Sequence, residues 1–255
     1  MTLPEWLTRP PLDTEKTFDR FVHEFGGRRV SELIEGIPTF DNADYFFEKQ
    51  GVLAELKTLK TDFGRTPRFQ DKYLELYKKY FDEGRMTFGA IFRPAEQPPE
   101  FAHDFVRLFR PPLEKILKKA NSQLKETRAY VGKAKAAHGI LLLVNDEFQS
   151  LEPRFIMGLL SDKLVHSYSS IDAFVYITLN HYVEVPGSDY AHLLWAPVYS
   201  DRGTDILRPF INDLGSQWYK FLDREIGPFD IPLKQTDDGS FLSGTRAIPT
   251  PKKPG

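Results

Sequence analysis

Residues 42–57 read Asn42-Ala43-Asp44-Tyr45-Phe46-Phe47-Glu48-Lys49-Gln50-Gly51-Val52-Leu53-Ala54-Glu55-Leu56-Lys57. Its two apolar runs are rich in strand-forming residues, and Gly51 closes the polar turn between them. We therefore predict a β-hairpin. With Lys49-Gln50 at its tip, paired residue numbers sum to 99, so that Asp44 faces Glu55.

The predicted register places two carboxylates opposite each other, where like charges destabilise a sheet. Glu55 and Lys57 share one face of their strand, because side chains alternate along it. A divalent cation would explain the pair, since Mg²⁺ takes carboxylate ligands and completes its shell with water and phosphate. A metal there favours attack on a phosphodiester. Lys57 would then contact the phosphate or position the attacking water.

The same residues resemble the PD-(D/E)XK nuclease superfamily. In that family an Asp near the start of one strand and a Glu-x-Lys on the next bind Mg²⁺ and cut phosphodiester bonds. The resemblance covers about sixteen residues. It implies a restriction-endonuclease-like fold, with Asp44 and Glu55 as ligands of Mg²⁺ or Mn²⁺ and Lys57 as the positioning residue. The proline before the family's Asp is absent, since Asn42-Ala43 stands there, and that position varies in the family.

Many members of the family add a glutamate from the preceding helix, and Glu24 is the candidate here. Helical spacing of Phe18, Phe21, Val22 and Phe25 predicts that helix, with Glu24 beside its apolar stripe. A surface glutamate is the competing interpretation, and Glu35 and Asp41 are alternative acids. For the hairpin itself, the competing interpretation is a solvated face with a surface ion pair.

Composition limits the function classes. The chain has 255 residues, a net charge of −2 and no cysteine, which excludes disulfides, Cys-ligated zinc and a thiol nucleophile. It contains no phosphate-binding glycine loop and no serine nucleophile elbow. No apolar run reaches a membrane-spanning length and no secretory leader is visible, so we expect a cytoplasmic protein with no membrane partner. We expect one domain over 1–228 and a Pro/Gly-rich tail over 229–255.

A basic stretch follows the hairpin. Residues 102–138 carry nine Lys or Arg against three acids, a local charge of +6. We predict a helix from Leu113 to about Val131, after a break at Arg110-Pro111-Pro112, and a basic helix face is typical of phosphate binding. A solvated helix face is the competing interpretation. The candidate nucleic-acid contacts are Lys115, Lys118, Lys119, Lys125 and Arg128.

The remaining elements predict an α/β fold with a mixed central sheet flanked by helices. The apolar run 139–146 reads as a buried strand, and strand–helix–strand over 139–179 suggests a parallel crossover. Residues 191–199 read as an edge strand that tolerates Pro197. Val30–Ile34 is compatible with a short strand or a further turn of helix, and we favour the strand.

These patterns predict a metal-dependent nuclease acting on nucleic acid, with DNA favoured over RNA and a homodimer left open. The first alternative is an inactive protein of the same fold whose basic helix binds nucleic acid or an acidic partner. The second is a protein-interaction module whose aromatic residues form the interface.

Overall fold

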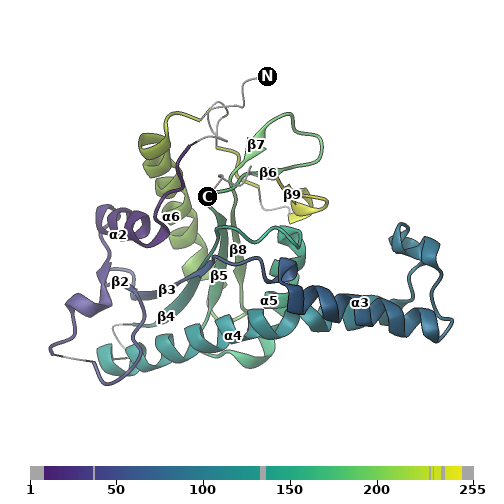
Figure 1. The fold of residues 1–255 in the computed structure, drawn as a ribbon. Coiled ribbons are helices and arrows are strands. Elements are labelled where there is room, and N and C mark those ends of the chain that lie inside the picture. The colour runs from purple at the N-terminus through teal and green to yellow at the C-terminus, as the bar shows by residue number, and fades with distance from the viewer. Residues whose placement is uncertain are drawn as a thin grey trace.

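The chain folds around a six-stranded mixed sheet with helices on both faces, an α/β architecture (Figure 1). The computed structural model describes residues 9–36, 38–132, 136–229, 231, 233–236 and 239–248. The strand order is β1-β2-β3-β4-β5-β8, and β7-β6-β9 form a separate small sheet. The strands are β1 (Arg28–Arg29), β2 (Tyr45–Phe47), β3 (Val52–Leu59), β4 (His138–Asn145), β5 (Ala173–Thr178), β6 (Val183–Glu184), β7 (Ala191–His192), β8 (Trp195–Tyr199) and β9 (Arg246–Ala247); the helices are α2 (Thr14–Glu24), α3 (Pro67–Asp82), α4 (Pro99–Val131), α5 (Pro153–Ser167) and α6 (Thr204–Ile226).

Two apolar layers cover the sheet, one on each face. Even-numbered residues of β3 pack with α2 and α6, and odd-numbered residues pack with α4 and α5. The first layer is built on aromatic contacts, among them Phe18 stacked on Trp218 with ring centroids 4.5 Å apart. This alternation decides which helix covers each side chain of the hairpin.

The hairpin has the predicted register. Tyr45 pairs with Ala54, Phe46 with Leu53 and Phe47 with Val52 in an antiparallel ladder. Gly51 adopts φ +65°, a left-handed conformation that glycine tolerates best and that closes the turn.

The later part of the sheet also agrees with the sequence. β4 pairs in parallel with both β3 and β5, and α5 connects β4 to β5. β8 pairs antiparallel with β5 and forms an edge of the sheet with Pro197 in it.

Two expectations about local structure were wrong. The first strand is Arg28–Arg29, and Val30–Glu32 forms a 3₁₀ turn in place of the expected strand. Pro111 and Pro112 do not break the basic helix, because α4 is continuous from Pro99 to Val131. Phe109 and Leu113, on either side of the prolines, are buried in the same apolar layer, and this packing offsets the backbone hydrogen bonds that proline cannot donate.

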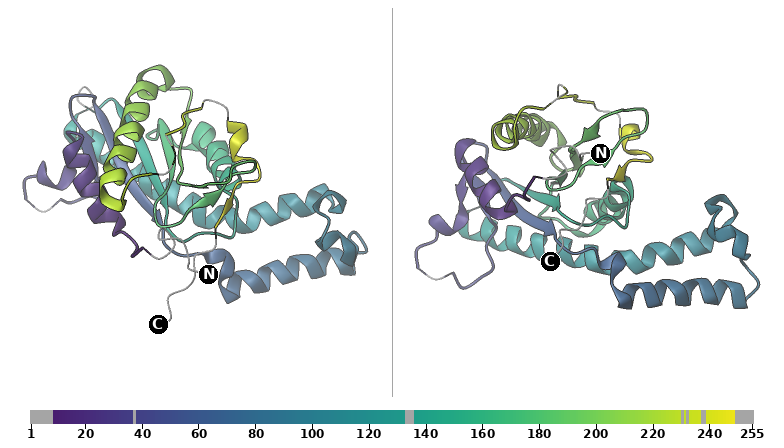
Figure 2. Two further views of the ribbon diagram at one scale, coloured as in Figure 1. Left: turned by 90° about the horizontal axis from the view of Figure 1, so that it is seen from above. Right: turned by 45° about the horizontal axis from the view of Figure 1, so that its top comes forward.

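Because α4 is uninterrupted, it extends beyond the sheet (Figure 1). Its N-terminal half and α3 run side by side and project beyond the sheet as an arm (Figures 1 and 2). The arm has its own small apolar core, which contains Tyr80, Met86 and Phe101. At its tip Phe88 and Phe92 remain 71% and 75% exposed.

The described part of the C-terminal segment packs against the rest of the chain. β9 pairs antiparallel with β6, and Leu242 is buried in the α4 and α5 layer. The rest of the predicted tail, at 230, 232, 237–238 and 249–255, lies outside the described residues. Over the part of the chain that is described, no helix combines the length and apolar character needed to cross a membrane.

Candidate active site

The structure brings Asp44, Glu55 and Lys57 together at the open end of the hairpin. Asp44 directly precedes β2, one step beyond the Tyr45–Ala54 pair, and therefore faces Glu55. Glu55 and Lys57 are odd-numbered residues of β3, so both lie on the face that α4 covers. The predicted juxtaposition of two carboxylates and a lysine is thus present.

Glu55 is the most unusual member of this group. It is a carboxylate with 0% exposure that pairs with the Lys57 ammonium, which is 21% exposed. Burial raises the pKa of Glu55 to about 8, and the Asp44 carboxylate adds to that rise, while Lys57 and Lys119 act against it. Glu55 Oε2 is buried without a hydrogen-bond partner among the described residues. An unpaired buried carboxylate oxygen is costly, so its position calls for a further partner.

Asp44 is held by the backbone of the neighbouring strand. The Leu56 amide donates a hydrogen bond to Asp44 Oδ2 over 2.8 Å. Burial raises the pKa of Asp44, and the Leu56 hydrogen bond and the Lys57 charge oppose that rise. Because β2 begins at Tyr45, the Asp44 side chain satisfies the Leu56 amide of β3, which lies beyond Ala54, the last β3 residue paired with β2.

Helix α4 fixes the chain that leads into Asp44. Gln123 donates to the Asn42 carbonyl over 2.9 Å, and the Ala43 amide donates to Thr127 Oγ1 over 2.7 Å. Gln123 Oε1 is buried without a hydrogen-bond partner among the described residues. Both side chains project from the buried side of α4, four residues apart. The helix therefore positions the acidic end of the hairpin.

The donor set is compatible with one small divalent cation. Glu55 Oε2 is unpaired, and Asp44 retains a second oxygen beside the one bound to Leu56. Mg²⁺ is commonly held by one or two carboxylates, with water and phosphate completing its shell. No group of three or more His, Asp or Glu side chains that could hold a metal ion occurs in the described ranges. The protein would supply only these two carboxylates, and other ligands would have to complete the shell of such a cation.

Glu24 does not join this group. It lies at the end of α2, on the opposite face of the sheet, and forms an exposed ion pair with Arg224. The acid of α2 whose charge reaches Asp44 is Glu15, in the first turn of the helix. The alternative acids Glu35 and Asp41 are both exposed.

The predicted nucleic-acid contacts separate into three groups. Lys119 flanks the site, since its charge acts on Glu55. Lys118 and Lys125 are exposed and lie seven residues apart, about two turns, so they are on the same side of α4. Lys115 is also exposed on α4. Arg128 is largely buried, contacts Asp172 Oδ2 over 3.3 Å, and bonds to the Ser170 carbonyl. The geometry gives Arg128 a structural role.

Gln123 and Thr127 contribute to the site but were not predicted from the sequence. The signal was available, because both are polar residues within the otherwise apolar stripe of a helix, at a spacing that places them on one face. Their partners could not be inferred, since they lie in a loop more than 80 residues away along the chain, as the separations of 81 and 84 positions show.

The sequence matches no family model, and comparisons with curated proteins and with solved structures give no match. The geometry of the site is therefore the basis for assigning a function.

Proposed function

We propose that this protein is a divalent-metal-dependent nuclease that hydrolyses phosphodiester bonds, with DNA as the favoured substrate. The observation that carries the proposal is the fully buried Glu55, which has an unpaired oxygen, contacts Lys57 and faces Asp44. A solvated hairpin face would leave such a carboxylate exposed. The order of elements, with a helix and a short strand before the hairpin, also agrees with a restriction-endonuclease-like fold.

Asp44 and Glu55 would hold the cation, Mg²⁺ or Mn²⁺. When bound, it would supply charge stabilisation at the phosphoryl oxygens and acidify coordinated water.

The protein's own groups would perform the remaining tasks. Lys57 is partly exposed beside the acids, so its ammonium can hold a phosphate oxygen or orient the attacking water. Gln123 and Thr127 would keep Asp44 in place by fixing the backbone before it. In hydrolysis, the water oxygen bonds to phosphorus, one phosphodiester P–O bond breaks, and the leaving oxygen takes a proton.

Substrate binding would use the exposed lysines of α4 beside the site. Cations that neutralise phosphates supply most of the sequence-independent affinity for nucleic acid. Lys119 lies on the flank of the helix nearest Glu55, and Lys118 and Lys125 extend the positive charge along α4.

The test is a cleavage panel. Plasmid DNA, single-stranded DNA and RNA are incubated with the purified protein in Mg²⁺, Mn²⁺ or EDTA, together with Asp44→Ala and Lys57→Ala. We expect metal-dependent cutting that falls by about 100-fold or more in both variants. Lys49→Ala, at the exposed hairpin tip, should cut like the wild type. Retardation of nucleic acid without any cutting would favour an inactive binding protein.

The arm supports a second candidate function, a protein-interaction module. Phe88 and Phe92 form an edge-to-face pair with centroids 6.0 Å apart, while Arg85 and Arg93 are neutralised by Glu83 and Glu96. An exposed apolar tip with paired charges suits a protein surface better than phosphate. A Phe88→Ser/Phe92→Ser double variant that loses a partner but cuts nucleic acid normally would separate the two functions.

A further inference from the structure

A serine and a histidine lie within hydrogen-bonding distance of each other in the hairpin that joins β6 to β7. Ser188 Oγ and His192 Nε2 are 2.7 Å apart. Both side chains are half-buried, and neither takes part in the nuclease proposal. A hydroxyl next to an imidazole is the arrangement that activates a serine nucleophile, because the ring can remove the hydroxyl proton as the oxygen attacks.

The backbone of the hairpin holds this pair together. Val183 pairs with His192 in the ladder between β6 and β7. The Ser188 amide donates to the Val185 carbonyl over 3.0 Å and closes a tight turn, in which Gly187 has φ +79°. A positive φ at the third position of a turn favours glycine. The turn therefore brings the serine toward the histidine, which follows four residues later in the chain.

The hydrogen bonds around Ser188 leave its hydroxyl proton available to the histidine. The Tyr190 amide donates to Ser188 Oγ over 3.3 Å, so the oxygen is an acceptor on that side. Burial lowers the pKa of His192, and the charge of Lys234 adds to that fall, so the ring is neutral near pH 7. A neutral ring with its proton on Nδ1 can accept the Ser188 proton at Nε2.

The same turn offers groups that a substrate could use. The Asp189 amide directly follows the serine, and among the described residues it donates to no acceptor. In α/β-hydrolases the amide after the nucleophile stabilises the oxyanion that forms during attack. The Tyr190 side chain, in the same loop, is 54% exposed and provides an apolar surface against which an acyl group can pack.

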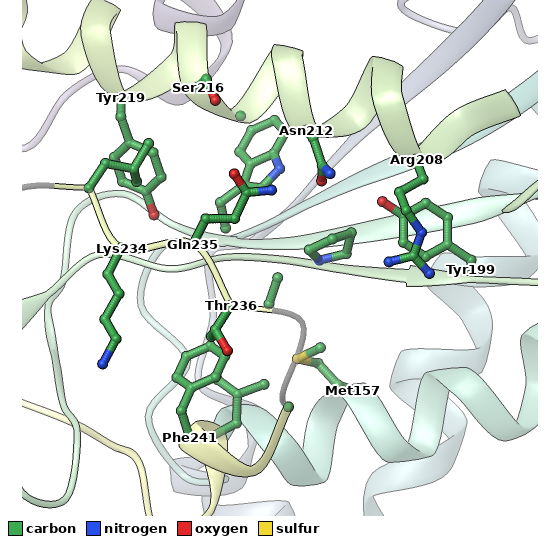
Figure 3. Close-up of a pocket in the computed structure, with 17 residues that line it drawn as sticks. Met157, Tyr199, Arg208, Asn212, Ser216, Tyr219, Lys234, Gln235, Thr236 and Phe241 are labelled. Atoms are coloured by element: carbon green, nitrogen blue, oxygen red, sulfur yellow. The ribbon is translucent and has the colours of Figure 1, made fainter. Parts of the chain in front are cut away.

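The cavity between β8 and α6 contains a serine that serves as a comparison. This cavity has a volume of about 280 Å³, and Ser216 is one of the residues that line it (Figure 3). No histidine is among the described residues of its lining. Ser216 thus lies in a hollow without a neighbouring base, whereas Ser188 lies in an open turn with one. Reaction with an electrophile distinguishes the two serines, because it depends on the base.

We propose that Ser188 and His192 form a nucleophile–base pair that hydrolyses small carboxylic esters with an apolar acyl group. Ser188 Oγ bonds to the acyl carbon as its proton passes to His192 Nε2, and the ester C–O bond breaks as the leaving oxygen takes that proton. A water oxygen then bonds to the acyl carbon, the bond to Ser188 Oγ breaks, and one water proton returns through His192 to the serine. The products are a carboxylic acid and an alcohol. This site shares no residue with the nuclease site.

The first test is labelling by a fluorophosphonate, from whose phosphorus an activated Ser188 Oγ displaces fluoride. The full-length protein is treated in EDTA, so that the result does not depend on the proposed metal site, and peptide mass spectrometry locates the adduct. We expect one adduct, on Ser188, that is absent in Ser188→Ala and forms about 100-fold more slowly in His192→Gln. The control Ser216→Ala should be labelled like the wild type.

The second test is turnover of 4-nitrophenyl butyrate. We expect the wild type and Ser216→Ala to hydrolyse this ester, and the rate to fall about 100-fold or more in Ser188→Ala and His192→Gln. Circular dichroism verifies that the variants are folded. No labelling of the wild type, an adduct on another residue, unchanged labelling in His192→Gln, or equal turnover by Ser188→Ala and the wild type would each overturn the proposal. None of these results would bear on metal-dependent cleavage of nucleic acid.

Discussion

Glu55 and Lys57 form an ion pair on the α4 face of β3, with the carboxylate fully buried and the ammonium reaching partly into solvent. The two carboxylate oxygens of Glu55 differ in their contacts. Lys57 donates a hydrogen bond to Oε1, and Oε2 has no hydrogen-bond partner in the described part of the chain. Ordinary protein cores avoid such an arrangement, and catalytic sites use it to hold groups in unusual protonation states.

This arrangement predicts that Glu55 destabilises the fold at high pH. Its pKa of about 8 lies above the value of 4.5 for a free side chain, so between these values the folded state keeps a proton that the unfolded state has lost. Stability should therefore fall as pH rises through this window. In EDTA, Glu55→Gln should be more stable than the wild type at pH 9, by on the order of 2 kcal/mol, and show little advantage near pH 4.5. Chemical denaturation at both pH values measures this, and an advantage that does not grow with pH would contradict it.

Lys119 and Arg128 should respond differently to removal of their charge. Lys119 is exposed beside the site, so Lys119→Gln should weaken DNA binding about threefold to tenfold and leave the melting temperature unchanged. Arg128 is packed against Asp172, so Arg128→Gln should lower stability by about 3 kcal/mol and leave the affinity of the folded protein unchanged. Fluorescence anisotropy with a labelled duplex and thermal unfolding separate these effects, and the reverse pattern would mean that the assignment of the two residues is wrong.

Gly139 should be essential for stability, because β4 passes very close to a neighbouring loop. A Cβ at this position would lie 2.2 Å from the Ser170 carbonyl oxygen, which belongs to the backbone and has little room to move. We expect Gly139→Ala to destabilise the protein by about 3 kcal/mol or more. At Gly158, within α5, an added Cβ would meet no atom within 4 Å, so Gly158→Ala should be stabilising by about 0.5–1 kcal/mol. Equal stabilities of the two variants would contradict the packing seen here.

The sequence was sufficient where local chemistry dominates. The hairpin register follows from two apolar runs and a polar turn that ends at Gly51, and the apolar run of β4 identified a central parallel strand. The opposed acids followed directly from that register.

Long-range packing determined what the sequence did not reveal. Tertiary contacts determine which face of the sheet a helix covers. Helix α2 covers the face opposite Glu55, so Glu24 lies away from the site. The prolines of α4 would break an isolated helix, but burial of Phe109 and Leu113 on either side of them stabilises a continuous one. From the sequence, Arg128 could not be distinguished from the exposed lysines near it, because its partner Asp172 lies 44 residues away along the chain.

Asp44 and Glu55 together are proposed to hold a divalent cation, and calorimetric titration with Mn²⁺ measures that binding. At pH 7, in two buffers of different ionisation enthalpy, we predict one site whose occupancy releases a proton, because Glu55 must lose the proton that its raised pKa retains. Binding should weaken at least tenfold in Asp44→Asn and in Glu55→Gln and persist in the matched control Glu24→Gln. A wild-type protein that binds no Mn²⁺, or binding that survives both substitutions, would contradict the claim.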